Sequence, residues 1–374
     1  MTHPRSLHLK LLILTAAFIA AFTAGCGALP LESWPGLTLV GDTLYAPYTA
    51  PNNRNRFQVV ALDLETQSPL WAYPNEPAAD IVPLAPAHIT DGRIYLTSYT
   101  GKVTVLDNDG TEIWTQQLTN ERLIAPATVL GNTLYIAASN GILYALDAAT
   151  GDELWRFTQN NVRFWAAPLV TEDTLYLPAV NHILYALDPA NGNLQWSVEL
   201  AGGLVDTPAL VQGKLIIGGL SNHLYALDPA NGDILWDFEA DGDGWIWATP
   251  LIVANTIYAG DLRGNLYAID FATGEKQWGA NYGNTGIRAA PVIYNNDTLI
   301  FGMESGELIA VEADGGAEIW RVEVDERNAD RLIGPLHIYK NWVIFMPVNA
   351  RITTLYAYNV ANGTLTWTYP PLDN

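Results

Sequence analysis

The chain has 374 residues, of which 49% are hydrophobic and 15% are charged. This composition excludes a largely disordered protein, because enough apolar surface is present to form a core. The formal net charge of −21 argues against a nucleic-acid partner, whose phosphates would be repelled. No block of like charge stands out along the sequence, so we expect the acids to form a solvated acidic surface.

The N-terminal residues have the pattern of an export signal. Arg5 and Lys10 precede an apolar run over residues 11–22, which is too short to span a bilayer comfortably. The run is followed by Thr-Ala-Gly and then by Cys26, the single cysteine of the chain. Ala-Gly-Cys resembles the end of the bacterial lipobox, in which the cysteine becomes the lipidated first residue. An ordinary secretory signal with a stray thiol is the alternative.

Three segments follow from this interpretation. We predict a lipoprotein signal peptide over residues 1–25, a tether over 26–35 that is lipid-anchored through Cys26, and a folded domain over 36–374.

The folded domain repeats a short hairpin. The stretch HLYALDPANGDILW ends at Trp236 and closely matches the stretch that ends at Trp196. Its apolar run is typical of a strand, and Asn231-Gly232 is typical of a tight turn, so the pattern predicts a β-hairpin. Related hairpins recur at intervals of roughly forty residues, which indicates a repeat architecture. Their final tryptophans are Trp71, Trp114, Trp155, Trp196, Trp236, Trp278, Trp320 and Trp367.

Each repeat contains four strand-like runs and usually begins at an Ala-Pro or Thr-Pro step. Proline at the start of a strand removes no hydrogen bond from the sheet. Four strands in each of eight repeats predict an all-β fold, an eight-bladed β-propeller of four-stranded antiparallel blades. Both ends of the repeat array look complete, so no strand exchange is needed to close the ring, although residues 31–34 could add a strand.

The recurring pattern Ala-x-Asp-x-x-x-Gly-x-x-x-Trp resembles the tryptophan-docking motif of the PQQ-type propeller repeat. A WD40 repeat fits less well, because the dipeptide Trp-Asp occurs only at Trp236-Asp237. The resemblance implies that the tryptophan of one blade stacks on the turn of its neighbour, where glycine leaves room for the ring. The first repeat departs from the pattern with Gln67 in place of glycine, and the second has a shortened turn. The resemblance covers about residues 36–369 and is more specific for fold than for function.

The non-repeating residues fall in the loops between the last strand of one repeat and the first strand of the next. Variable loops on a rigid scaffold are where binding residues collect, and arginine and aromatic residues are common at interface anchors. The candidate partner-binding residues in these loops are Arg163, Trp165, Asp206, Trp245, Trp247 and Arg288.

An enzymatic alternative is a quinoprotein dehydrogenase, in which Trp165, Asp206 and Trp247 would surround the quinone. One cysteine cannot supply the adjacent pair of the methanol-dehydrogenase type, and the cofactor-binding insertions of that family are missing. The sequence also has no nucleophile elbow, no phosphate-binding loop and no paired histidine spacing. The stretch Asp241-Gly242-Asp243-Gly244 matches only part of a calcium loop. We therefore expect no catalytic, cofactor-binding or metal site.

An eight-bladed PQQ-type propeller on a lipoprotein of this length resembles the BamB-like outer-membrane assembly lipoproteins. The resemblance implies a non-catalytic scaffold of the cell envelope, at the outer membrane if the host has one, and a monomer is expected. It further implies binding of the barrel-forming assembly protein through loops on one face. The family's partner-contacting acid precedes a Thr-Pro strand start, a context that Asp206 shares. A carbohydrate- or ligand-binding propeller, with Trp165, Trp245 and Trp247 as stacking platforms, is the remaining alternative.

Overall fold

The computed structural model describes residues 36–49, 57–78, 85–324, 331–348 and 354–370. The predicted signal peptide, the tether and Cys26 lie outside the described residues. Residues Trp34–Asn374 form one compact unit, and every regular element described in it is a β-strand. Within the described ranges there is no helix with the length and apolar character needed to cross a membrane.

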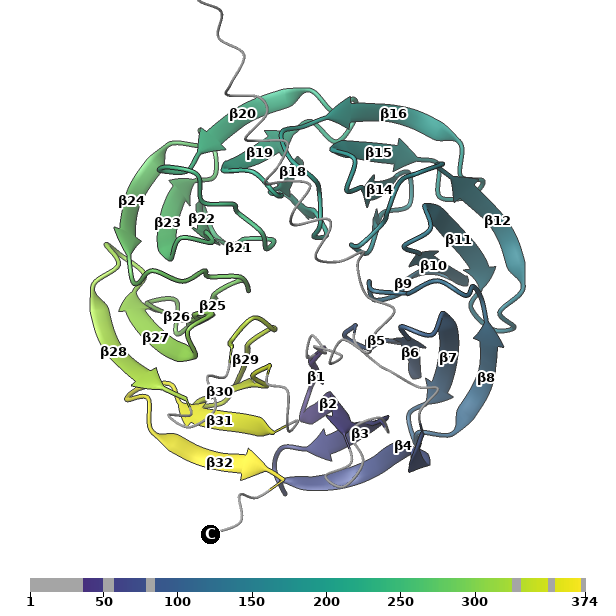
Figure 1. Cartoon of the computed structure of the whole chain (residues 1–374), viewed down its shortest axis with the longest axis horizontal. Helices are drawn as coiled ribbons and strands as arrows, with labels where there is room; N and C mark the ends of the chain where they lie inside the picture. Colours follow the sequence, from purple (N-terminus) through teal and green to yellow (C-terminus); the bar gives the residue numbers. More distant parts are fainter. Residues whose placement is uncertain (1–35, 50–56, 79–84, 325–330, 349–353, 371–374) are drawn as a thin grey trace, which may run out of the picture. The chain divides into compact units, whose positions relative to one another are not determined.

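The described strands form eight sheets, and each sheet consists of four strands that are consecutive in the sequence. All neighbouring strands within a sheet are antiparallel. Figure 1 shows the sheets as blades around a common centre, with the first strand of each blade innermost. The predicted eight-bladed β-propeller is therefore confirmed.

The first four blades run from residue 38 to residue 199. Blade 1 contains β1 (Thr38–Val40), β2 (Thr43–Thr49), β3 (Phe57–Asp63) and β4 (Ser68–Ala78). Blade 2 contains β5 (His88–Thr90), β6 (Arg93–Thr97), β7 (Lys102–Asp107) and β8 (Glu112–Gln117). Blade 3 contains β9 (Thr128–Leu130), β10 (Thr133–Ala137), β11 (Ile142–Asp147) and β12 (Glu153–Thr158). Blade 4 contains β13 (Leu169–Val170), β14 (Leu175–Pro178), β15 (Ile183–Leu187) and β16 (Leu194–Glu199).

The last four blades run from residue 209 to residue 369. Blade 5 contains β17 (Ala209–Val211), β18 (Lys214–Ile217), β19 (His223–Leu227) and β20 (Ile234–Glu239). Blade 6 contains β21 (Leu251–Val253), β22 (Thr256–Gly260), β23 (Asn265–Asp270) and β24 (Lys276–Asn281). Blade 7 contains β25 (Val292–Tyr294), β26 (Thr298–Gly302), β27 (Glu307–Glu312) and β28 (Glu318–Glu323). Blade 8 contains β29 (His337–Tyr339), β30 (Trp342–Phe345), β31 (Leu355–Asn359) and β32 (Leu365–Tyr369).

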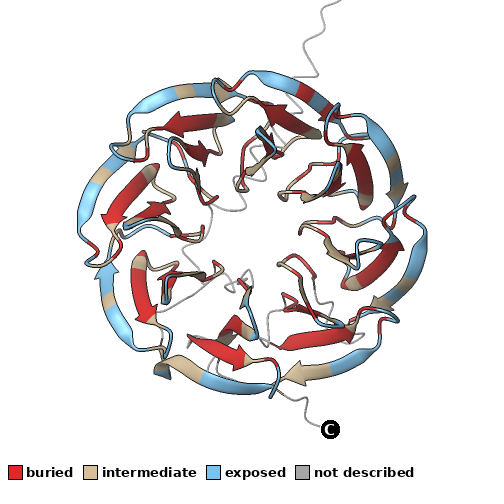
Figure 2. Ribbon diagram, turned by 180° about the vertical axis from the view of Figure 1, so that it is seen from behind, coloured by how far each residue is buried: buried red, intermediate tan, exposed pale blue. Residues whose placement is uncertain are grey.

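The core lies between the blades rather than at the centre of the ring. The middle strands are nearly continuous apolar runs because neighbouring blades cover both of their faces. In β11, for example, residues 143–146 are all buried, and Leu143 shares an apolar cluster with Leu175 of blade 4. The outermost strand β12 alternates instead, with Trp155 and Phe157 half-buried between exposed residues. Figure 2 shows buried middle strands and outermost strands with long exposed stretches, while the innermost strands are mostly of intermediate burial.

The outermost strands also link the blades through their tryptophans. A Cβ atom at Gly192 would lie 2.6 Å from the ring of Trp155, so the glycine leaves room for the indole of the preceding blade. The Trp155 Nε1 donates a hydrogen bond to the carbonyl of Pro189 at 3.2 Å. The tryptophans that lie against a glycine of the next blade are Trp71, Trp114, Trp155, Trp196, Trp236, Trp278 and Trp320.

The eighth tryptophan has a different environment. By the same rule Trp367 belongs against the turn of blade 1, where Gln67 replaces glycine and adopts a φ of 53°. The Nε1 of Trp367 is buried and has no hydrogen-bond partner in the described part of the chain. Its ring packs edge-on against Trp342 of its own blade, with ring centres 5.7 Å apart. This docking contact is therefore weakest where the ring closes.

Polar contacts join blades 8 and 1 instead. The Tyr339 hydroxyl donates to Asp42 Oδ1 at 2.7 Å, and His337 Nε2 donates to the Leu37 carbonyl at 3.1 Å. Lys340 and Glu65 form an ion pair at 2.8 Å. Both blades contain four consecutive strands of their own, so no strand is exchanged between them within the described residues.

Candidate functional site

The antiparallel order of the strands sorts the connections onto two faces. Turns that join first to second strands and third to fourth strands lie on one face, which we call the turn face. Turns that join second to third strands lie on the other face, together with the loops that lead to the next blade, and we call this the loop face. All six candidate partner-binding residues lie in loops of the loop face.

The loops leading to blades 3 to 8 share one structural feature. Each contains a residue that is at most 2% exposed and belongs to the apolar cluster between two adjacent blades. We call these the anchor residues, and they are Leu123, Phe164, Leu204, Ile246, Ile287 and Leu332.

Hydrogen bonds fix the backbone beside each anchor residue. The carbonyl of Arg163, just before Phe164, accepts from the Val180 amide at 3.1 Å, and that of Arg122, before Leu123, accepts from Ser139 at 3.2 Å. The carbonyls of Gly203, Trp245, Gly286 and Arg331 accept in the same way. Each loop is therefore held by a buried side chain and by a turn of the next blade.

The residues that flank the anchors differ in burial: Gly203, Val205, Gly286 and Ile333 are buried, and the others are exposed or partly buried. The residues before the anchors are Arg122, Arg163, Gly203, Trp245, Gly286 and Arg331. The residues after them are Ile124, Trp165, Val205, Trp247, Arg288 and Ile333. Five of the six predicted partner-binding residues thus flank an anchor, and Asp206 lies two residues after Leu204.

Asp206 is held by the starts of two neighbouring inner strands. Its Oδ1 accepts from the Thr207 amide at 2.8 Å and its Oδ2 from the Thr249 amide at 2.6 Å. The Thr249 hydroxyl donates in turn to the carbonyl of Thr207. Burial raises the pKa of Asp206, and the amides of Thr249 and Thr207 offset this only in part. The carboxylate therefore joins blades 5 and 6 and has a fixed orientation.

Arg288 and Trp247 come together across the loops to blades 6 and 7. The Arg288 guanidinium carbon lies 4.6 Å from the centre of the Trp247 ring. Arg288 Nε also forms an ion pair with Glu304 at 2.9 Å, and the two side chains are 15% and 24% exposed. Arg288 is thus a half-buried link between an aromatic ring and an acid, rather than a freely solvated arginine. Glu304 is not among the candidate residues that the sequence pattern predicts.

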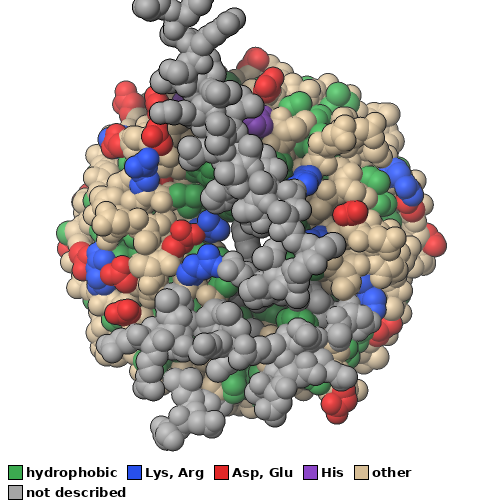
Figure 3. All heavy atoms as spheres, in the orientation of Figure 1, with side chains coloured by type: hydrophobic (Ala, Val, Ile, Leu, Met, Phe, Trp, Pro, Cys, Tyr) green, Lys and Arg blue, Asp and Glu red, His purple; other side chains and the backbone are tan. Residues whose placement is uncertain are grey.

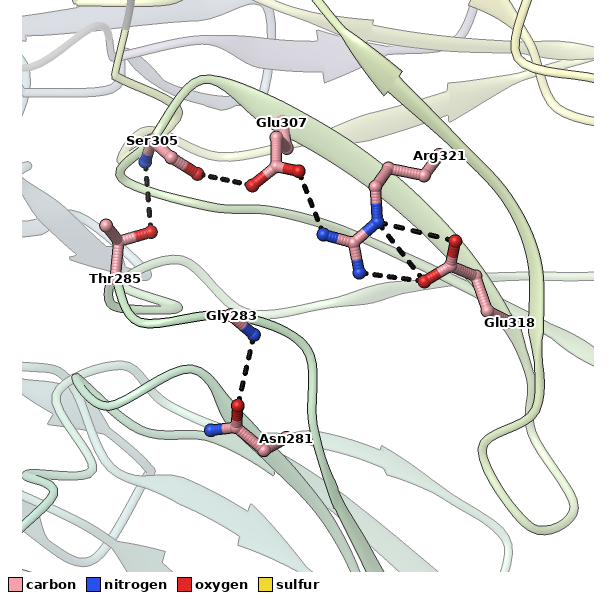
Figure 4. A network of polar contacts seen from close by, with 7 residues as sticks. All are labelled: Asn281, Gly283, Thr285, Ser305, Glu307, Glu318 and Arg321. Atoms are coloured by element: carbon pink, nitrogen blue, oxygen red, sulfur yellow. Dashed lines mark hydrogen bonds and ion pairs between the residues drawn. The ribbon is translucent and has the colours of Figure 1, made fainter.

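A polar network holds the loop that carries Arg288. Figure 4 shows a chain of contacts from this loop across blade 7 to its outermost strand. Thr285 Oγ1 accepts from the Ser305 amide at 3.2 Å, and the Ser305 hydroxyl donates to Glu307 at 2.8 Å. Glu307 then pairs with Arg321 at 2.8 Å, and Arg321 also pairs with Glu318. Glu304, which pairs with Arg288, is adjacent to Ser305 and so shares this support.

Of the remaining candidates, Arg163 and Trp165 lie on the loop to blade 4, and Trp245 lies on the same loop as Trp247. Arg163 is exposed and has neither an ion pair nor a side-chain hydrogen bond within the described ranges. Trp165 and Trp245 are partly buried. The structure therefore brings Trp247 together with Arg288, and it leaves Arg163 and Asp206 on other loops of the same face.

Comparison with known proteins identifies the family. A family model described as "Outer membrane protein assembly factor BamB" matches residues 55–207 and 180–372. The chain belongs to this family. A search of curated protein sequences finds no match to the chain.

Solved structures with the same fold include members and non-members of the BamB family. BamB from Moraxella catarrhalis has a TM-score of 0.67 and 20% identity, over 89% of this chain and 94% of that one. The computationally designed Ika8 protein has a TM-score of 0.69 and 14% identity, over 87% and 96%. The quinohemoprotein alcohol dehydrogenase ADHIIG from Pseudomonas putida HK5 has a TM-score of 0.65 and 13% identity, over 86% and 69%. At these identities the likeness concerns the fold alone.

We next ask whether a cavity of this BamB-family chain has side chains that could bind a quinone cofactor such as PQQ. Two cavities of about 10 Å³ flank blade 1, and one of them is lined by Ala46, Pro47, Tyr48, Val60, Leu62, Met346, Leu355 and Tyr369. PQQ carries several carboxylates, and this lining contains no basic side chain, so the cavity does not fit the cofactor. The side chains that line the second cavity likewise include no basic group.

The acids of the partial calcium loop have protein partners. Asp241 pairs with Lys276 at 2.7 Å, and Asp243 lies 3.5 Å from Arg263. Among the described residues, no group of three or more histidine, cysteine or acidic side chains is arranged to hold a metal ion.

Proposed function

We propose that this BamB-family propeller is a non-catalytic scaffold of the cell envelope that binds other proteins through its loop face. The barrel-forming protein of outer-membrane assembly is the partner that the family name favours. The observation that carries the proposal is the common construction of the loops. Anchor residues and backbone hydrogen bonds fix the backbone of the loops that carry arginine, tryptophan and acidic side chains on one face. A preorganised loop backbone loses little conformational freedom on binding, which favours affinity.

Within this surface, Arg163, Trp165 and Asp206 form the first part of the proposed interface, over blades 3 to 5. Trp245, Trp247 and Arg288 extend it over blades 6 and 7. Arginine and tryptophan are enriched among the residues that dominate interface energies. Asp206 adds a fixed carboxylate that suits a basic group of the partner.

Membrane attachment is part of the same proposal. Lipidation at Cys26, after removal of residues 1–25, would place the scaffold on the membrane where barrel proteins assemble. Metabolic labelling with a radioactive fatty acid tests this directly. Labelled chain is expected from the native gene, and none from a Cys26→Ser variant; equal labelling of both would contradict the anchor.

A pull-down of the native, detergent-solubilised protein tests the scaffold function. We expect the host's barrel-forming assembly protein to co-purify, and we expect its recovery to fall with Asp206→Arg and with Arg163→Glu. Asp233→Arg and Arg156→Glu are the matched controls, because both positions are exposed and lie away from the loop face. A chain that captures no barrel-forming protein would contradict the proposal, and PQQ and sugars would be the next ligands to test.

A further inference from the structure

The structure separates the charges of the chain by face. Among the described residues, the connections of the turn face contain Lys340 as their single basic residue. The acids of the same connections are Asp42, Glu65, Asp91, Asp109, Asp152, Glu172, Asp173, Asp188, Asp228, Asp233, Glu275, Asp297 and Asp314. This face is therefore strongly negative and repels acidic surfaces.

The loop face is nearly balanced. Its described connections contain the bases Arg122, Arg163, Arg263, Arg288 and Arg331 and the acids Glu121, Asp206, Asp241, Asp243, Asp261 and Glu304. Figure 3 shows Lys and Arg side chains gathered around the centre of the face turned to the viewer. An acidic partner can therefore approach the loop face without the repulsion that the turn face exerts.

Two arginines of the loop face occupy the same structural position on adjacent loops. Arg122 precedes the anchor Leu123 between blades 2 and 3, and Arg163 precedes the anchor Phe164 between blades 3 and 4. The carbonyl of each accepts a hydrogen bond from a turn of the following blade. Both side chains are exposed, and neither forms an ion pair within the described residues.

Local contacts fix the backbone at both arginines, and a ring contact also orients Arg122. The guanidinium carbon of Arg122 lies 5.5 Å from the centre of the Tyr99 ring, and the Ser139 hydroxyl donates to the Arg122 carbonyl at 2.9 Å. Arg163 stands between Val162 and Phe164, which are 8% and 0% exposed. Two buried neighbours force the Arg163 side chain outward. The two charges are therefore set one blade apart on a rigid surface.

We propose that Arg122 and Arg163 form a two-point anchor for a protein partner that presents two acidic groups one blade apart. The inference rests on the proposed scaffold function and specifies the chemistry of the partner at that surface. Arginine pairs with carboxylates through two parallel hydrogen bonds, so paired sites fix the orientation of the partner as well as its affinity.

The test measures binding of the full-length protein to the purified periplasmic portion of the host's barrel-forming assembly protein. Arg122→Glu is expected to weaken binding about tenfold or more, as Arg163→Glu does, because a like charge then faces the partner's acid. Arg122→Lys keeps the charge but not the pair of parallel hydrogen bonds, so its affinity is expected to lie between those of the wild type and Arg122→Glu. Arg156→Glu is the control, since it makes the same charge change on β12, where the side chain is 51% exposed. Thermal unfolding of each variant verifies folding.

The outcomes separate the two proposals. Wild-type binding with equal affinities for Arg122→Glu and Arg156→Glu would overturn the two-point anchor and leave the scaffold function intact. Absence of wild-type binding would overturn both. Vesicles with and without phosphatidylglycerol provide a second arm. If Arg122→Glu weakens binding to the anionic vesicles but not to the protein, the two arginines serve a lipid surface and the inference is wrong.

Discussion

At the scale of single residues, the glycines of the docking turns serve two purposes that substitution can separate. Gly192 has a φ of 75° and faces the ring of Trp155, whereas Gly213 has a φ of 74° with nothing within 4 Å of an added Cβ. Alanine at either position adopts a left-handed conformation at a cost of about 1–2 kcal/mol. At Gly192 the methyl group also collides with the indole, which adds about 1–3 kcal/mol.

We therefore expect Gly192→Ala to lower the free energy of unfolding by more than Gly213→Ala. Denaturant unfolding, followed by tryptophan fluorescence, measures both. Equal losses would mean that the turn requires only the backbone conformation, and that the Trp155 ring yields to the methyl group at no cost.

The carboxyl of Asp206 makes stability depend on pH in a direction opposite to that of most acids. Its pKa is raised by burial, so the folded chain binds this proton more tightly than the unfolded chain does. The stabilising contribution is full below the unfolded pKa of about 3.9 and is lost as pH rises through the folded pKa. The free energy of unfolding of the wild type, minus that of Asp206→Asn, should therefore fall as pH rises through this window.

Asp147 supplies a control of opposite sign. The backbone amides of Ala149 and Thr150 donate hydrogen bonds to its carboxylate, and these hydrogen bonds lower its pKa. Its contribution is present above the unfolded pKa and is lost as pH falls, so the difference between wild type and Asp147→Asn should rise with pH. Urea unfolding at a series of pH values measures both differences. Parallel curves for the two variants would contradict the assigned directions.

At the scale of elements, the docking contacts are not equivalent around the ring. Trp236 is 9% exposed and donates from Nε1 to the Phe271 carbonyl at 3.1 Å. Trp367 has no such acceptor in the described part of the chain. Phenylalanine at position 236 removes one hydrogen bond to the Phe271 carbonyl, which still accepts from Lys214 Nζ at 3.2 Å. Phenylalanine at position 367 instead removes an unsatisfied donor.

Trp236→Phe should therefore lower the free energy of unfolding by about 1 kcal/mol more than Trp367→Phe, because only Trp236 loses a hydrogen bond. Equilibrium unfolding by urea gives the comparison. A larger loss for Trp367→Phe would mean that the junction of blades 8 and 1 depends on its tryptophan despite the missing hydrogen bond.

The repeat elements were predictable because their determinants are local. An aspartate, a glycine and a tryptophan at fixed spacing define each hairpin, and the apolar runs before them define the buried strands. The register of the loops was not predictable in this way. The anchor Leu123 lies three residues before the strand-start Pro126, whereas Phe164 lies four before Pro168. Alignment on proline therefore hid the equivalence of Arg122 and Arg163, which only the pattern of burial reveals.

At the scale of the whole molecule, the distribution of charge between the two faces could also not be predicted from the sequence. No acidic block is visible because the acids are spread one or two to a turn. The antiparallel blades then collect these turns on one face, and a modest local bias becomes a strongly negative surface. Among the described connections, the excess of acids over bases therefore lies on the turn face. Pairing of Arg288 with Glu304 across a turn is likewise a product of the fold, since no sequence spacing relates the two.

This concentration of charge should make the stability of the chain depend on salt. Like charges on one face repel each other, and 0.5 M sodium chloride shortens the Debye length to about 4 Å, against about 10 Å at 0.1 M. The exposed ion pair of Lys340 and Glu65 is weakened by the same screening, but surface pairs contribute little. At pH 7 we therefore expect the melting temperature to rise by about 2 °C or more over this range of salt. Near pH 4, where many carboxyls are protonated, the rise should largely disappear. A melting temperature that falls with added salt at pH 7 would mean that ion pairs between the blades outweigh repulsion on the turn face.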